Sequence, residues 1–134
     1  MKNLILLFSL ILSFSSCSQN GEEKINDNSI VGTWKLIEVY SSDGGTNPQW
    51  KPVENGYTYT FYSNGVIKSS KFNCDGKYTL NTSNSVHIEF DCNNSKMNGN
   101  FDFKFMDENL IFTPNPNTCF EGCDEKFMKI EELK

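Results

Sequence analysis

Residues 76–92 read GKYTLNTSNSVHIEFDC, and this stretch has the clearest strand pattern in the chain. Hydrophobic residues alternate with polar ones on both sides of a polar centre at Ser83, which is the pattern of two strands that each bury one face. A turn centred on Ser83 sets Leu80 opposite Val86 and Tyr78 opposite Ile88. The stretch therefore predicts an antiparallel β-hairpin.

The register of this hairpin also makes a prediction about two cysteines. Continued outward from the turn, it sets Cys74 directly opposite Cys92, close enough for a disulfide bond. Closing a loop of this length would stabilise the domain by about 3 kcal/mol in the chain-entropy account.

The rest of the chain from Ile30 onward has the same character. Short alternations of apolar and polar residues are separated by turn residues, and no long stretch has helical periodicity. Ser63-Asn64-Gly65 is typical of a hairpin turn, and a bulge at Gly65 would set Ile67 opposite Phe61. A closing strand is expected over residues 126–133.

These strands predict an all-β fold, an eight-stranded antiparallel up-and-down barrel. A meander of eight strands with one apolar face each can close on itself and remove its edges. The alternative is an immunoglobulin-like sandwich, which needs crossover connections and a long-range disulfide around a central Trp. Here the best-supported disulfide lies within one hairpin and Trp34 precedes both of its cysteines, so the barrel is preferred.

Residues 1–17 have the layout of a bacterial lipoprotein signal. Lys2 precedes an apolar run over residues 4–12, and small residues then lead directly to Cys17. The run is too short for a membrane-spanning helix, and a cysteine at the cleavage point is the residue that receives the lipid. The open alternative is an ordinary signal peptide with a free cysteine near its end.

The signal sets the expected domain limits and the expected address. We expect a signal peptide over residues 1–16, a lipidated N-terminus with a flexible tether over 17–29, and the barrel domain over 30–134. The lipid would anchor the domain in the cell envelope, at the outer membrane. Glu22-Glu23 fits either a surface-export signal or a solvated linker, so periplasmic and surface-exposed locations both stay open.

Charge argues against nucleic acid as a partner. The formal net charge is −5, and all 12 basic residues are lysines. Recognition of phosphates and base edges relies on the guanidinium fork of arginine, which the chain lacks.

The first predicted strand carries the resemblance to a known family. Gly32-Thr33-Trp34 resembles the Gly-x-Trp motif that opens the first strand of lipocalins. The segment Phe61-Tyr62-Ser63-Asn64-Gly65, together with the terminal Cys119-x-x-x-Cys123, resembles the short lipocalin-like lipoproteins of Bacteroidetes. The resemblance implies a lipocalin-like barrel in which a late cation, Lys126 or Lys129 here, lies over Trp34.

The predicted inward face is aromatic, and two interpretations of it stay open. In the first, the rings line a cup for a small apolar ligand, with Tyr hydroxyls as polar anchors. The residues proposed to line it are Trp50, Tyr57, Tyr59, Phe61, Tyr78, Phe90 and Phe103. In the second, the same rings fill the barrel, and loops bind a protein partner in the envelope.

Trp50 lies in a long loop between two predicted strands. Residues 41–56 (SSDGGTNPQWKPVENG) are rich in Gly and Pro and predict an irregular lid over the open end. Trp50 would either contact a ligand or partner there, or fold back and plug the opening.

The remaining chemistry-bearing residues favour a structural role. Cys119 and Cys123 are expected to form a small disulfide loop, with a thiolate metal site as the alternative. The single histidine, His87, alternates outward on its strand and has no nucleophile to pair with. We therefore expect no enzyme activity, no cofactor and no metal.

Overall fold

The computed structural model describes residues 29–45, 47–119 and 122–131 of the chain. The predicted signal peptide, Cys17 and nearly all of the predicted tether lie outside these residues. Within them the chain forms antiparallel strands and no helix, so no helix there could cross a membrane. The strands are β1 (Gly32–Ser41), β2 (Gln49–Pro52), β3 (Thr58–Phe61), β4 (Val66–Ser69), β5 (Gly76–Thr82), β6 (Ser85–Cys92), β7 (Ser95–Met106), β8 (Asn109–Asn115) and β9 (Glu125–Glu131).

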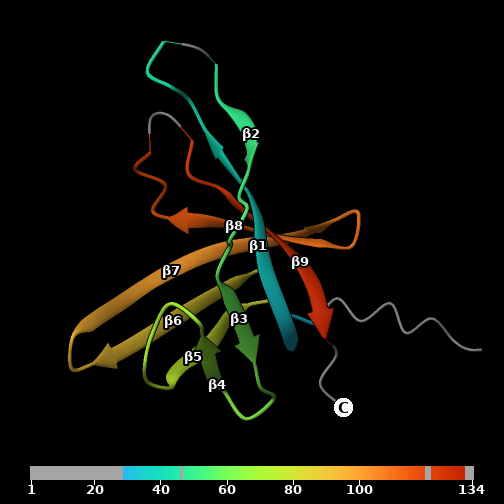
Figure 1. Cartoon of the computed structure of the whole chain (residues 1–134). Helices are drawn as coiled ribbons and strands as arrows, with labels where there is room; N and C mark the ends of the chain where they lie inside the picture. The colour runs from blue at the N-terminus through green and yellow to red at the C-terminus, as the bar shows by residue number, and fades with distance from the viewer. Residues whose placement is uncertain (1–28, 46, 120–121, 132–134) are drawn as a thin grey trace, which may run out of the picture.

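The nine strands form one sheet in which β1 pairs with β9, the last strand of the chain. The hydrogen-bonded order is β2-β1-β3-β4-β5-β6-β7-β8-β9. β2 and β3 pair with different halves of β1, at residues 38–41 and 32–35 respectively. The hydrogen bonds from β1 through β3 to β9 therefore run round a ring (Figure 1).

The predicted hairpin register is confirmed from Lys77 to Leu80 and shifts before Thr82, which pairs with Ser85, while Leu80 is 51% exposed. β5 and β6 pair with Leu80 opposite Val86, as the turn at Ser83 requires. A disulfide joins Cys74 to Cys92, with their Cα atoms 5.6 Å apart. The bulged turn is confirmed too, because Ile67 faces Phe61 and Gly65 has a φ of 83°, in the left-handed region that glycine favours.

One expectation about the fold is wrong. Residues 41–56 are not wholly irregular, because β2 pairs with the end of β1 and makes the strands nine rather than eight. Trp50 faces Tyr40 across this pair, with ring centroids 5.2 Å apart. A cross-strand aromatic pair stabilises a short hairpin. Pro52 is tolerated because it ends a strand at the edge of the sheet.

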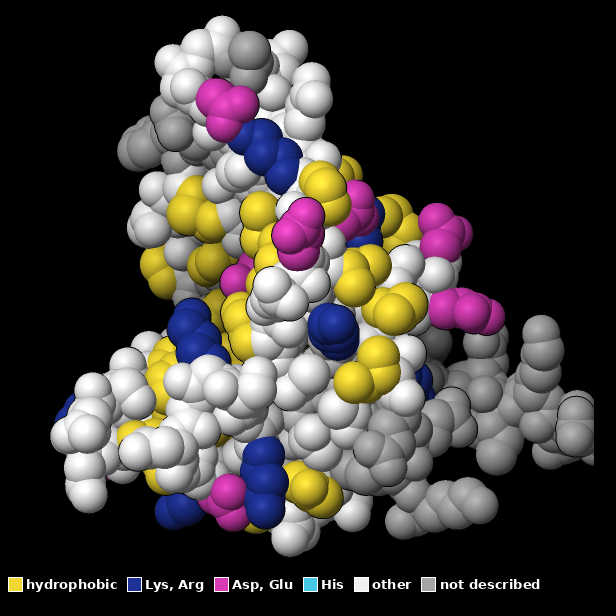
Figure 2. Space-filling model, in the orientation of Figure 1, with side chains coloured by type: hydrophobic (Ala, Val, Ile, Leu, Met, Phe, Trp, Pro, Cys, Tyr) yellow, Lys and Arg dark blue, Asp and Glu magenta, His cyan; other side chains and the backbone are white. Residues whose placement is uncertain are grey.

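The β1–β2 hairpin rises beyond the rest of the ring together with the connection between β8 and β9 (Figure 1). The two segments touch, since the Tyr40 amide donates to the carbonyl of Asp124 at 2.8 Å. A Cβ placed on Gly122 would lie 2.8 Å from the Tyr40 ring, so only glycine fits there. These segments make a projecting lobe, and Figure 2 shows hydrophobic side chains in the notch below it.

The inner faces of the strands carry a continuous hydrophobic core. At most 7% of the surface of each core side chain is exposed, and Phe61, Ile67, Val86, Ile88, Leu110 and Phe127 are fully buried. Trp34 is 2% exposed, and its indole N–H donates to the Ile30 carbonyl at 2.8 Å. Of the two lysines considered for the place over Trp34, Lys129 takes it, with Nζ 5.5 Å from the ring centroid.

The disulfide in the hairpin yields a stability prediction. Replacing Cys74 and Cys92 by Ser should lower the free energy of unfolding by about 3 kcal/mol, because the open loop adds conformational entropy to the unfolded chain. Urea unfolding followed by circular dichroism measures the change. The Cys119–Cys123 bridge closes a loop with a sequence separation of 4 rather than 18, so its double Ser variant should lose less. Equal losses would contradict the chain-entropy account.

Candidate functional site

Six of the seven residues proposed to line a site come together inside the ring. The Tyr59 ring lies 5.9 Å from that of Phe61 and 6.4 Å from that of Phe90, measured between centroids. Tyr78 joins the group through Phe61 at 5.0 Å, and Tyr57 joins through Tyr59 at 5.1 Å. Phe103 reaches the same group through Phe112, 6.3 Å away.

Most of these rings are closed off from solvent. Exposure is 3% for Tyr59, 0% for Phe61, 1% for Phe90 and 7% for Phe103, so side chains fill this part of the interior. Only Tyr57 and Tyr78 stay partly exposed. Of the six residues, only these two tyrosines can therefore contact a ligand without a rearrangement of the interior.

Trp50 lies apart from the other six, on the opposite face of the sheet. Its ring contacts Tyr40 and carries the Lys126 Nζ 4.2 Å from its centroid. Side chains alternate between the two faces of a strand, and Phe127, the next residue on β9, is buried. Lys126 therefore points outward. Lys126 also forms an ion pair with Glu38, largely shielded from solvent.

Glu125 is the inward-facing charged residue that the sequence interpretation missed. It begins β9 two residues before buried Phe127 and so shares its face. Its carboxylate accepts a hydrogen bond of 2.8 Å from the Tyr57 hydroxyl. The Tyr57 ring in turn lies 5.7 Å from Phe127, which sets the carboxylate against the aromatic interior.

Lys71 brings a positive charge to the same place. It belongs to the connection between β4 and β5, and its Nζ lies 5.0 Å from the centroid of the Tyr57 ring. The next residue, Phe72, stacks on Phe90 at 4.2 Å, which holds this connection against the interior. We call Tyr57, Tyr59, Lys71 and Glu125 the mouth site.

Burial governs the protonation of the mouth site. Removal from water raises the pKa of Glu125, while the Tyr57 hydrogen bond and the charge of Lys71 act in the opposite direction. Burial likewise raises the pKa of Tyr59 to about 12, with Glu125 adding to the rise. Burial and the same carboxylate also raise the pKa of Tyr57, so both phenols stay protonated and Tyr57 can donate to Glu125.

A weak signal for Glu125 exists in the sequence. If the alternation of the last strand is extended back from Phe127, Glu125 falls on the buried face. The predicted strand began at Lys126, so Glu125 was not assigned to a face. Lys71 gives no such signal, because its position over Tyr57 depends on how the connection between β4 and β5 folds back.

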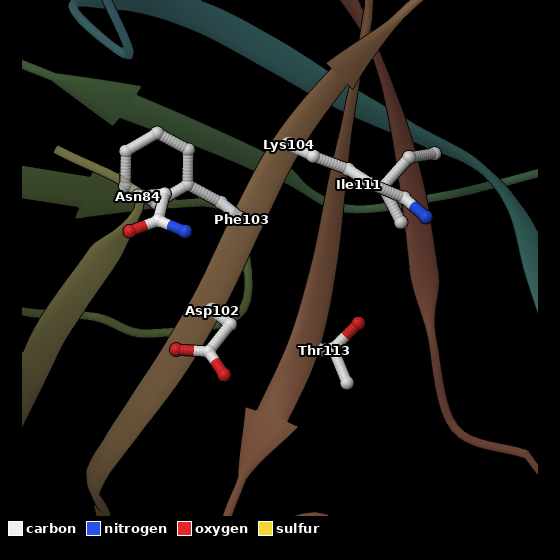
Figure 3. Close-up of a pocket in the computed structure, with 6 residues that line it drawn as sticks. All are labelled: Asn84, Asp102, Phe103, Lys104, Ile111 and Thr113. Carbon is white, nitrogen blue, oxygen red and sulfur yellow. The ribbon is translucent and has the colours of Figure 1, made fainter.

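A separate shallow pocket lies between β7 and β8, next to the β5–β6 turn (Figure 3). Its volume is about 180 Å³, below the several hundred Å³ of most small-molecule sites. Its lining is Asn84, Asp102, Phe103, Lys104, Ile111 and Thr113. Phe103 is the one residue that it shares with the predicted ligand-binding set, so this pocket is not the predicted site.

The cysteines and the histidine form no reactive group in the described residues. Cys119 and Cys123 are joined by a disulfide, as expected, so neither offers a thiolate. The His87 ring bonds to Asn100 at 2.9 Å. No group of three or more His, Cys, Asp or Glu side chains gathers there in a way that could hold a metal ion.

A scan against protein-family models found no match, and a search of the curated proteins found none either.

The raised pKa of Glu125 yields a prediction about stability and pH. A raised pKa means that the folded protein holds the proton more tightly than the unfolded chain does. The wild type should therefore gain stability relative to Glu125→Gln as the pH falls through the folded pKa, and the gain should be complete below the ordinary value of 4.5.

Urea unfolding at a series of pH values from about 4 to about 8 measures this difference in the free energy of unfolding. The range begins below the ordinary carboxyl pKa and extends about three units above it, where a raised pKa would lie. At pH 7 the variant should be at least as stable as the wild type, because the Gln carbonyl can still accept from Tyr57. The same substitution at exposed Glu89 is the control. A Glu125→Gln deficit that grows as the pH falls through the same range would support the prediction; one that is constant with pH would contradict it.

Proposed function

We propose that this chain is a lipid-anchored, lipocalin-like lipoprotein of the cell envelope that binds a small apolar ligand at the mouth site. The proposed fold is an eight-stranded barrel. The nine strands fit it because β2 and β3 pair with different halves of β1 and together count as one strand of the barrel. The Gly-x-Trp segment, with Lys129 over Trp34, supports the lipocalin-like assignment.

The hydrogen bond between Tyr57 and Glu125 is the observation that carries the binding proposal. This bond and the charge of Lys71 offset part of the cost of removing the carboxylate from water, and they place a polar group at the edge of an otherwise apolar interior. Small-molecule sites combine an apolar lining with a few placed polar groups. Because the rings deeper inside the barrel are closed off, the ligand would sit against Tyr57 and Val39, which are both partly exposed.

The proposed address rests on the sequence of residues 1–17. Cys17 would carry the lipid, and the tether would leave the domain free to face the periplasm or the cell surface. The acidic, arginine-free composition argues against nucleic acid as a partner.

An alternative function is supported by the outer face of the projecting lobe. Trp50, Tyr40 and Lys126 form a compact aromatic and cationic cluster there. Trp and Tyr are frequent anchors of protein interfaces. Under this alternative the interior is structural, and a protein partner in the envelope docks on this cluster.

Blocking the mouth tests the binding proposal. Val39 faces Glu125 directly across β1 and β9, so the two side chains share one face. Val39→Trp should weaken binding of the apolar fluorophore N-phenyl-1-naphthylamine about tenfold or more, since the indole would fill the site. Fluorescence titration measures the dissociation constant.

The matched control for this experiment is Met128→Trp, which adds the same ring at a position that is 45% exposed on β9. Its dissociation constant should equal that of the wild type. Equal affinity in all three proteins would contradict binding at the mouth and favour the protein-partner alternative.

The anchor is tested separately. Cys17→Ser should abolish incorporation of labelled palmitate and move the protein from the membrane fraction to the aqueous fraction, because no acyl chain remains. Cys119→Ser is the control and should keep the label. A Cys17→Ser protein that stays labelled would overturn the assignment of Cys17.

A further inference from the structure

The mouth site has an asymmetry between its two charges. Glu125 is fixed on β9, points inward and is half-buried, and its carboxylate is held by the Tyr57 hydroxyl. Lys71 is exposed, belongs to a connection between strands, and reaches the site through its long side chain. The negative charge is therefore part of the framework, whereas the positive charge is a side chain that can leave.

The position of Lys71 is the position that an organic cation would take. Its ammonium lies 5.0 Å from the centroid of the Tyr57 ring, within the range of a cation–π contact. It is also close enough to Glu125 for its charge to favour the ionised carboxylate. An aromatic face beside a desolvated carboxylate is the chemistry that recognises ammonium groups.

We propose that the mouth site binds the ammonium group of an amphipathic amine, with Glu125 as its counter-ion, and that Lys71 occupies the place of this group in the free protein. This inference rests on the proposed function, since it names the ligand class of the same site. The apolar part of the amine would lie against Tyr57 and Val39, which are partly exposed, and the ligand would displace Lys71 on binding.

An anionic ligand fits the site less well. It would have to approach the fixed carboxylate of Glu125 and be held by Lys71 alone, the side chain with the greater freedom. It would also compete for the Tyr57 hydroxyl, which already donates to Glu125 at 2.8 Å. Like charges in a site partly removed from water repel strongly.

Three ligands with one skeleton separate these cases. Tryptamine carries an ammonium group, 3-ethylindole lacks it, and indole-3-propionate carries a carboxylate instead. The full mature chain, held in nanodiscs of zwitterionic phospholipid, is titrated with each by calorimetry at pH 7, and empty nanodiscs correct for partitioning. Tryptamine should bind about tenfold more tightly than 3-ethylindole, and indole-3-propionate should bind most weakly.

Variants of the two charged residues test their separate roles. Glu125→Gln should remove the preference for tryptamine, so that tryptamine and 3-ethylindole bind this variant with about equal affinity. Lys71→Gln should tighten tryptamine binding several-fold, because the internal competitor is gone. Lys68→Gln is the matched control, since Lys68 also lies over a tyrosine ring, 5.8 Å from the centroid of Tyr62, and should bind all three ligands as the wild type does.

Each contrary result has a distinct meaning. Equal affinities for tryptamine and 3-ethylindole would overturn the inference and leave apolar binding at the mouth intact. Tightest binding of indole-3-propionate, lost in Lys71→Gln, would overturn it in favour of an anionic ligand. If none of the three binds, the inference fails, and N-phenyl-1-naphthylamine titrated on the same sample decides whether the proposed function fails with it.

Discussion

The pairing of β1 with β9 is the contact on which the rest of the structure depends. β1 is bonded to β2 and β3 along one edge and to β9 along the other, so it closes the ring of strands. Without the β9 contact both strands would be edges with unpaired backbone groups, which promote aggregation. The same contact sets Val39 beside Glu125 and brings the carboxylate within reach of Tyr57, so closure of the sheet also builds the mouth site.

The hairpins of this fold could be predicted from short sequence patterns, because their registers depend on the turn and on the alternation next to it. The alternation in residues 76–92 fixes one register, and that register dictated which cysteines meet. β2 escaped prediction because Gly and Pro dominate its surroundings, while the contact that stabilises it is the facing pair Tyr40 and Trp50. Glu125 was missed for a related reason, since an acidic residue at the start of a strand suggests solvent until its partner is known.

The mouth site contains one feature that lowers the stability of the folded protein and two that partly restore it. Burial of Glu125 penalises its charge, and the Tyr57 hydroxyl and the Lys71 ammonium offset part of that penalty. An apolar residue at this position would pack without such a cost. Residues that reduce stability in this way gather at functional sites, because binding uses the interaction that folding leaves incomplete.

The two disulfides join residues only 18 and 4 positions apart, whereas β1 and β9 lie at opposite ends of the domain. Oxidation and ring closure are therefore separable events. Each cysteine meets its partner in a short loop, which closes quickly and favours the native pairing over a scrambled one. In a chain that emerges from its N-terminus onward, Cys74 and Cys92 can be joined before β9 is available to pair with β1, a contact between the two ends of the domain that is expected to form slowly.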